Sequence, residues 1–261
     1  MEVVIRPTHQ DAAELTARFI ANAIRRKPKL VLGLATGRTM ESVYGILVRM
    51  HREGSLDFSL VETFNLDEYI GLPPDHPQSY RRYMRELLFS HVNIDLRNTH
   101  FPRGNAPDID AECLRYETAI RDCGGIGLQL LGIGRSGHIG FNEPLSAMLS
   151  RTRAKALTPA TMAQNSPLFA DPAEMPRRAI TMGVGTILES KECILLATGE
   201  EKAEVIAKAV EGPVSSMISA SALQLHASCH VIVDEAAASK LQNKDYYRWI
   251  FENEPDWDDY R

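Results

Sequence analysis

The sequence is poor in cysteine and has no long hydrophobic run. Its four cysteines include no CxxC pair, and two of them lie in apolar surroundings where a thiol serves as a small buried hydrophobe. This usage favours a reducing compartment. No segment approaches the roughly 20 apolar residues that span a bilayer, and the first ten residues lack the apolar centre of a signal peptide. We therefore expect a cytoplasmic protein that does not act at a membrane.

A block of basic residues is also missing. The 29 Lys and Arg are interspersed with 34 Asp and Glu, and the formal net charge is −5. Nucleic acid is therefore not an expected partner, and any anion must be held locally. The length fits one α/β domain over residues 1–261, and no repeat or low-complexity linker divides it.

What the sequence does contain is a regular alternation of helix and strand patterns. Apolar residues at helical spacing predict helices over 9–26, about 40–51, around 80–89, and over 108–123, 183–190 and 200–212. Runs that are apolar on both faces predict strands over 30–35, 61–66, 126–133, 192–199 and 229–234. This alternation predicts an α/β fold with a mostly parallel sheet and helices on both faces. We expect the aromatic, acidic tail over 245–261 to pack on the domain surface.

In an open α/β sheet the ligand lies outside the carboxyl ends of the strands, so the residues that follow each strand deserve inspection. Four such corners stand out: ATGRT (35–39), NLDEY (65–69), GRSGHIGFNEP (134–144) and TGEEK (198–202).

Two of these corners suit a phosphate. Thr36, Gly37, Arg38 and Thr39 offer backbone N–H groups, hydroxyls and a guanidinium at a helix N-terminus. A plain helix cap by Thr39 explains this stretch equally well. Lys202 stands in the first turn of a helix, where a cation opposes the helix dipole unless an anion lies beside it.

The other two corners suit proton transfer. Asp67 and Glu68 follow a buried strand, where carboxylates often cap the next element, but a partly buried carboxylate can also act as a general base. His138 lies between glycines in a strand-end loop, and Glu143 is close enough in the chain to orient its ring. A histidine suits the donation of a proton to a ring oxygen of a substrate and its recovery.

Three familiar motifs nearly fit the loop that contains His138. Residues 132–137 spell GxGxxG, but Pro144 interrupts the following helix and no acidic residue stands about 20 positions on, so nicotinamide binding is not expected. The GxSxG elbow fails because His138 replaces its last glycine. One histidine with carboxylates on separate corners gives no zinc-type spacing, so no metal is expected.

Taken together, the long motifs resemble the glucosamine-6-phosphate deaminase family. The matching stretches run in order over nearly the whole chain: LGLATGRT, TFNLDEYIGLP, HPQSY, GNAPDIDAEC, GIGRSGHIGFNEP, SRTRAKALT, AITMGVGTIL and ATGEEKAEVIAKAVEGPVSSMISASALQLH. The resemblance implies a doubly wound, Rossmann-like α/β fold. It also implies conversion of glucosamine 6-phosphate and water to fructose 6-phosphate and ammonia, without a metal or redox cofactor.

Carried over by residue, the resemblance implies that Asp67 is the base that moves a proton between C2 and C1. His138 is the ring-opening histidine and Glu143 supports it. The implied phosphate-binding residues are Thr36, Gly37 and Thr39 of the first corner, and Lys202.

The chain departs from the best-known members of this family at several positions. Ser136 stands where they have an aspartate two residues before the histidine, so the contact between His138 and a carboxylate rests on Glu143 alone. We still count Ser136 with the catalytic group, since a serine can hydrogen-bond the imidazole. Pro167 replaces an arginine that contacts the phosphate from a mobile lid, and Arg38, a glycine in those relatives, is a candidate to compensate. Arg153 and Lys155 match effector-binding positions of some members, and we assign them no such role. Residues 145–178 follow the catalytic loop and are a candidate lid.

Alternatives remain at this stage. The related 6-phosphogluconolactonases share the fold, but a lactonase needs no base for a C2 proton, which disfavours it. A galactosamine-6-phosphate deaminase and a sugar-phosphate sensor that has lost the chemistry both stay open, and so does assembly into a homo-oligomer.

Overall fold

A computed structural model describes residues 1–261, and its centre is a seven-stranded sheet in the order β1-β10-β9-β6-β2-β3-β5. All the neighbouring strands pair in parallel. The strands are β1 (Glu2–Arg6), β2 (Val31–Leu34), β3 (Glu62–Asn65), β5 (Thr99–His100), β6 (Leu128–Leu131), β9 (Cys193–Ala197) and β10 (Cys229–Asp234). The predicted α/β class and its mostly parallel sheet are confirmed.

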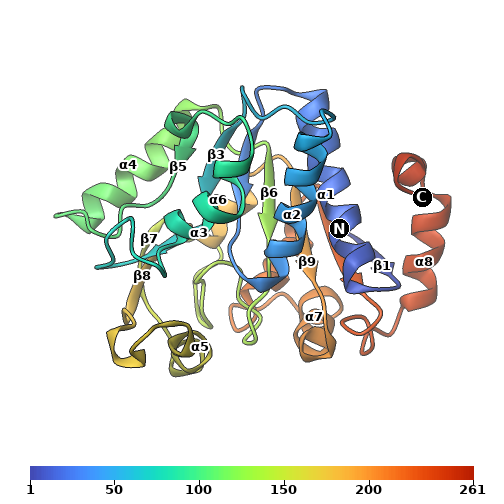
Figure 1. The fold of residues 1–261 in the computed structure, drawn as a ribbon. Coiled ribbons are helices and arrows are strands. Elements are labelled where there is room, and N and C mark those ends of the chain that lie inside the picture. The colour runs from blue at the N-terminus through green and yellow to red at the C-terminus, as the bar shows by residue number, and fades with distance from the viewer.

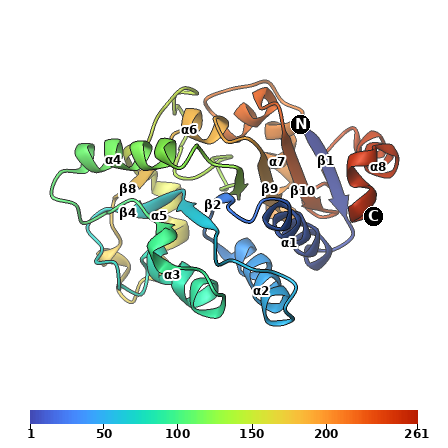
Figure 2. The same cartoon turned by 90° about the horizontal axis from the view of Figure 1, so that it is seen from above.

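Helices cover both faces of this sheet, as predicted. Figure 2 shows α1, α2 and α3 on one face and α4, α6 and α7 on the other. The helices are α1 (His9–Arg26), α2 (Arg38–Arg52), α3 (Tyr80–Leu87), α4 (Ile109–Asp122), α5 (Pro159–Asn165), α6 (Val184–Leu188), α7 (Ala203–Val210) and α8 (Lys244–Asn253). The helix patterns read from the sequence therefore correspond to real helices, with bounds that differ by a few residues. One detail is wrong: α2 is capped by Gly37 without a side-chain bond, and Thr39 lies inside the helix.

The strand order has a reversal between β2 and β6. From β2 the chain winds outward through β3 and β5, whereas from β6 it winds the other way through β9 and β10. In doubly wound sheets, the carboxyl ends of the two strands at such a reversal flank a crevice that binds ligands. In Figure 1 the arrow of β6 points toward the end of the molecule where α5 lies. The corners ATGRT and GRSGHIGFNEP follow these two strands.

A second sheet stands apart from the first, and the sequence did not predict it. It is antiparallel, in the order β4-β8-β7, and its strands are β4 (Asp67–Tyr69), β7 (Arg153–Ala156) and β8 (Arg178–Thr181). The strand β7 has no buried residue, so its sequence carries no apolar alternation to read. Its backbone instead pairs with β8, whose Thr181 also lies opposite Asp67 of β4. This sheet frames the segment that contains α5.

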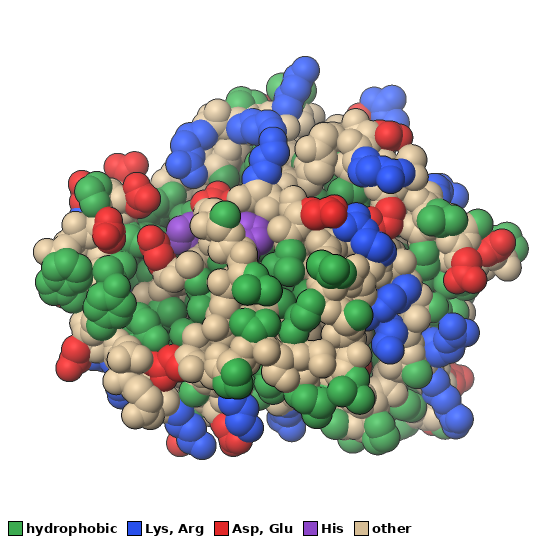
Figure 3. All heavy atoms as spheres, turned by 180° about the vertical axis from the view of Figure 1, so that it is seen from behind, with side chains coloured by type: hydrophobic (Ala, Val, Ile, Leu, Met, Phe, Trp, Pro, Cys, Tyr) green, Lys and Arg blue, Asp and Glu red, His purple; other side chains and the backbone are tan.

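Two hydrophobic clusters match the two sheets. The larger comprises 64 buried residues around the parallel sheet, and the smaller has seven under the antiparallel one. The predicted tail packs on the surface as α8 and a final 3-10 helix (Pro255–Tyr260). On the face in Figure 3, acidic and basic side chains both occur and hydrophobic ones gather near the centre. None of the helices combines the length and the apolar character that crossing a membrane requires.

Candidate active site at the carboxyl edge of the sheet

The loop after β6 brings His138 back against the start of the same loop. Gly137 and Gly140 adopt positive φ angles of 79° and 55°, which side chains other than glycine rarely take. A Cβ on Gly134 would lie 2.0 Å from His138 Nε2, so the imidazole occupies the space that a side chain there would fill. A 3-10 helix (Ser219–Leu225) supports the loop, since Ser219 Oγ donates to the carbonyl of Asn142 at 2.8 Å.

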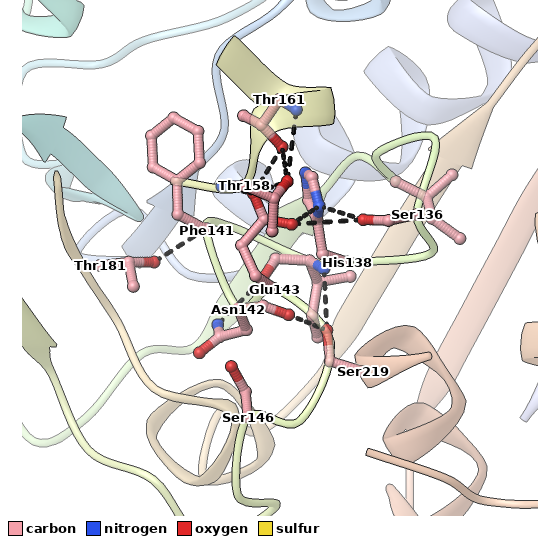
Figure 4. A network of polar contacts seen from close by, with 12 residues as sticks. Ser136, His138, Phe141, Asn142, Glu143, Ser146, Thr158, Thr161, Thr181 and Ser219 are labelled. Atoms are coloured by element: carbon pink, nitrogen blue, oxygen red, sulfur yellow. Dashed lines mark hydrogen bonds and ion pairs between the residues drawn. The ribbon is translucent and has the colours of Figure 1, made fainter. Parts of the chain in front are cut away.

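His138, Glu143 and Ser136 form one hydrogen-bonded group (Figure 4). His138 Nδ1 lies 3.0 Å from Glu143 Oε2 and 2.7 Å from Ser136 Oγ. Because an ionised carboxylate only accepts, we infer that Nδ1 carries the proton of the neutral ring. Nε2 then remains an acceptor, and it makes no hydrogen bond within the protein. The structure thus brings together the acid and the histidine that the sequence singled out.

The second oxygen of Glu143 is bound by the segment that contains α5. Thr158 Oγ1 donates to Glu143 Oε1 at 3.1 Å and Thr161 Oγ1 donates to it at 2.5 Å. Burial alone would raise the pKa of the Glu143 carboxyl, but hydrogen bonds from His138 and Thr161 outweigh it and bring the pKa to about 2. Glu143 is therefore a fixed negative charge that connects His138 to α5.

Asp67 and Glu68 are neighbours with different surroundings. Glu68 accepts hydrogen bonds from the N–H groups of Tyr69, Tyr80 and Arg81, so it caps the start of α3. Asp67 instead lies against the loop after β6, since a Cβ on Gly140 of that loop would lie 3.4 Å from Asp67 Oδ2. Burial raises the pKa of the Asp67 carboxyl to about 8, and the charge of Glu68 adds to the rise. Asp67 is the one of the two that suits proton transfer.

The two phosphate corners lie on either side of β6. Thr36, Gly37, Arg38 and Thr39 join β2 to α2, and Gly37 has a positive φ of 121°. Lys202 ends a short 3-10 helix before α7, and its Nζ donates to the carbonyl of Ile133 at 2.8 Å. Burial lowers the pKa of Lys202. Lys202 therefore reaches from the end of β9 to the end of β6, although its phosphate role stays a prediction.

A cavity of about 290 Å³ opens beside His138. It lies between the loop after β6 and α5, and its lining is Arg135, Ser136, His138, Ala160, Thr161, Ala163 and Gln164. A larger, more open groove of about 600 Å³ runs beside α7 and contains none of the predicted site residues. The smaller cavity is the candidate substrate site, because it is lined by the predicted site residues Ser136 and His138. No group of three His, Cys, Asp or Glu side chains is arranged to hold a metal ion.

Sequence reasoning missed three residues of this site: Arg135, Thr158 and Thr161. Thr158 is recognisable as the N-cap before Pro159, but nothing local indicates that its hydroxyl also reaches Glu143, 15 residues earlier. Arg135 could have been found by its place in the loop with His138. Arg153, given no role above, donates to Asn142 Oδ1 at 2.9 Å and to Ser146 Oγ at 3.1 Å.

A buried carboxyl, a histidine–carboxylate pair and two anion-suited corners at the carboxyl edge of a parallel sheet are typical of an α/β enzyme that moves protons on a small anionic molecule. Comparison with known proteins specifies this class. Residues 7–231 match the family described as glucosamine-6-phosphate isomerases/6-phosphogluconolactonase. The chain belongs to this family.

Individual relatives agree over nearly the full length. The chain is 52% identical over 250 residues to the glucosamine-6-phosphate deaminase of Shewanella loihica, covering 96% of this chain and 93% of that protein. Against the same-named protein of an Arthrobacter species, identity is 49% over 257 residues, 98% of this chain and 99% of the relative. A solved structure described as a monomeric glucosamine-6-phosphate deaminase superposes with a TM-score of 0.90 at 44% identity, covering 92% of this chain and all of that one.

A second solved structure shows how widely the fold extends. The 6-phosphogluconolactonase from Trypanosoma cruzi superposes with a TM-score of 0.72 at 18% identity, covering 92% of this chain and 97% of that one. The resemblance and the doubly wound α/β fold read from the sequence are confirmed.

Proposed function

We propose that this protein is a glucosamine-6-phosphate deaminase, which converts glucosamine 6-phosphate and water to fructose 6-phosphate and ammonia. One observation carries the proposal: a chain about half identical to proteins of that name places Asp67 against the loop that holds the His138–Glu143 pair. A lactonase would have no use for a base at the position of Asp67.

The geometry supports a role for each group. His138 Nε2, free to accept, takes the proton of the C1 hydroxyl and returns it to the ring oxygen, which opens the pyranose. Glu143 stabilises the imidazolium that forms in between. Asp67 then removes the C2 proton and delivers it to C1, which converts the enolamine to a ketimine at C2. Water adds to this imine and ammonia leaves.

The remaining residues are assigned by position. Thr36, Gly37, Arg38, Thr39 and Lys202 bind the phosphate group, and Ser136 completes the hydrogen bonding of His138 Nδ1. We propose that residues 145–178 act as a lid over the substrate. This role is supported by α5, which lines the cavity and is bound to Glu143 through its first turn.

Ammonia release from glucosamine 6-phosphate tests the function, with galactosamine 6-phosphate assayed in parallel. Asp67→Asn keeps the shape of the side chain but cannot accept the C2 proton, so it should lower turnover by about 10²- to 10⁴-fold. We expect the wild type to release ammonia from glucosamine 6-phosphate and the Asp67→Asn variant to lose this activity. Faster turnover of galactosamine 6-phosphate would reassign the substrate, and binding without ammonia from either would make the protein a sensor.

The compartment, the partner and the assembly of the protein complete the proposal. We propose that it runs in the cytoplasm, a reducing compartment that suits the four unpaired cysteines. The phosphorylated amino sugar is the one partner we propose. A homo-oligomer stays a prediction, and the structural relative at 44% identity is described as monomeric.

A further inference from the structure

The α5 side of the cavity brings no positive charge to it. From residue 156 to residue 176 the sequence contains neither Lys nor Arg. The residues that α5 contributes to the lining are all uncharged: Ala160, Thr161, Ala163 and Gln164. A phosphorylated substrate carries close to two negative charges at neutral pH, so the attraction must come from the opposite side of the cavity.

The loop on that opposite side carries one cation, and a second cation bonds the same loop. Arg135 lines the cavity next to Ser136 and His138, and its guanidinium makes no hydrogen bond or ion pair with the protein. Lys202 bonds the carbonyl of Ile133, two positions before Arg135, and no carboxylate forms an ion pair with it. Burial lowers the pKa of Lys202, and the negative charge of Glu201 opposes this shift. The positive charge of Arg135 lowers the pKa of Lys202 further, because Arg135 and Lys202 repel each other.

Two neighbouring cations that repel each other are stabilised when an anion binds between them. A guanidinium is planar and presents paired N–H groups that match two phosphate oxygens at once, while an ammonium group acts as a point charge. Arg135 therefore suits the directional part of an anion site, and Lys202 suits a second positive charge beside the same loop. Neither Lys202 nor Arg38 lines this cavity, but Lys202 bonds the loop that carries Arg135, whereas Arg38 makes no such bond.

We propose that Arg135 is a substrate-binding residue that holds the phosphate group of the sugar together with Lys202, from the fixed loop of the cavity. This inference rests on the proposed function for its substrate. It adds that phosphate affinity is built into the loop after β6, so the loop that holds His138 also fixes the distance between the phosphate and the reacting end of the sugar.

The test measures binding and turnover separately. Fructose 6-phosphate is titrated calorimetrically into the wild type, Arg135→Ala and Arg135→Lys, and the kinetics of ammonia release are measured on the same proteins. Arg26→Ala is the matched control, because Arg26 is an exposed arginine at the end of α1 that makes no side-chain bond. Arg26→Ala removes one positive charge, as Arg135→Ala does, but at the opposite, amino edge of the sheet.

We expect Arg135→Ala to raise the Kd of fructose 6-phosphate and the KM by about tenfold to a hundredfold, as for loss of a charge-assisted bond. The kcat of Arg135→Ala should stay within about threefold of the wild-type value, because the lost contact stabilises the bound substrate and the transition state equally. Arg135→Lys should recover part of the affinity, and Arg26→Ala should match the wild type.

Three results would overturn the inference: a Kd for Arg135→Ala within about twofold of the wild type, a loss of kcat at unchanged Kd, or a wild type that binds no sugar phosphate. Failure of the proposed function looks different. If the protein binds fructose 6-phosphate through Arg135 but releases no ammonia, the role of Arg135 stands and the proposed deaminase activity is wrong.

Discussion

At the scale of single residues, the site depends on how each carboxyl group is surrounded. Asp67, Glu68 and Glu143 are all buried, yet Glu68 is satisfied by backbone N–H groups and Glu143 by hydroxyls and an imidazole. Asp67 lacks such a set of donors, so burial keeps its proton on. Only the ionised form of Asp67 can accept a proton from carbon, and its fraction increases as the pH approaches about 8.

This buried carboxyl predicts a pH-dependent cost in stability. The pKa of Asp67 is raised from 3.8 to about 8 in the folded protein, so between these values the folded state holds a proton that the unfolded state has released. The folded state is then progressively disfavoured as the pH rises. Asp67→Asn, which cannot ionise, should be more stable than the wild type at pH 8, by on the order of a few kcal/mol.

Urea unfolding at several pH values measures this difference. The advantage of Asp67→Asn should shrink as the pH falls from 8 and nearly vanish at pH 4. An advantage of equal size at both ends would show that the amide acts through packing or hydrogen bonding, and that Asp67 titrates normally.

At the scale of secondary structure, α5 is the element that couples the cavity wall to the chemistry. Its N-cap Thr158 and its residue Thr161 both donate to Glu143, whose other oxygen contacts His138. The helix has seven residues and its only buried one is Thr161. Met162 packs against the smaller hydrophobic cluster and Asn165 Nδ2 donates to the Tyr69 hydroxyl at 3.1 Å. The bonds to the charged group Glu143 are the ones that join α5 to the loop after β6.

Thr161→Val tests this coupling. The change keeps the size of the side chain but removes a donor to a charged group, and we expect kcat/KM to fall about tenfold. Amide hydrogen exchange over residues 156–176 should also accelerate. Ser166→Ala is the control, because that hydroxyl lies in the same segment and makes no side-chain bond to Glu143. Unchanged exchange and activity in Thr161→Val would mean that α5 is held by other contacts.

At the scale of the whole molecule, the two ends of the chain meet at the sheet edge formed by β1, three strands away from β6. Figure 1 shows both termini on this side. Trp257 is 1% exposed, and its Nε1 donates to Glu2 Oε2 at 2.9 Å. Phe19 of α1 stacks on Tyr260 at 5.4 Å between ring centroids. The tail thus closes the core at a distance from the active site.

Trp257→Ala should therefore reduce stability without altering catalysis. We expect a loss of about 3–5 kcal/mol in the free energy of unfolding, with an unchanged KM under native conditions. Trp249→Ala is a matched control, because Trp249 lies on α8 and is 55% exposed, so its loss should change stability by no more than about 0.5 kcal/mol. Equal destabilisation by the two variants would show that the aromatic cluster does not close the core.

The sequence by itself determined the class of the fold and the main candidates of the site. Apolar periodicity is a local property, so β2, β6, β9 and the long helix α1 could be read directly. Asp67 and His138 could be singled out because the end of a strand in a parallel sheet is a position fixed by the chain itself.

Tertiary structure alone decided how those candidates work. The strand β7 forms because β8 pairs with it, and Glu143 receives its donor from Thr161, 18 residues away. Lys202 bonds the carbonyl of Ile133, 69 residues earlier in the chain. Which of Asp67 and Glu68 becomes a helix cap likewise depends on where α3 begins. Such contacts join residues that are distant in the chain, and no local pattern specifies them, because packing of whole elements brings them together.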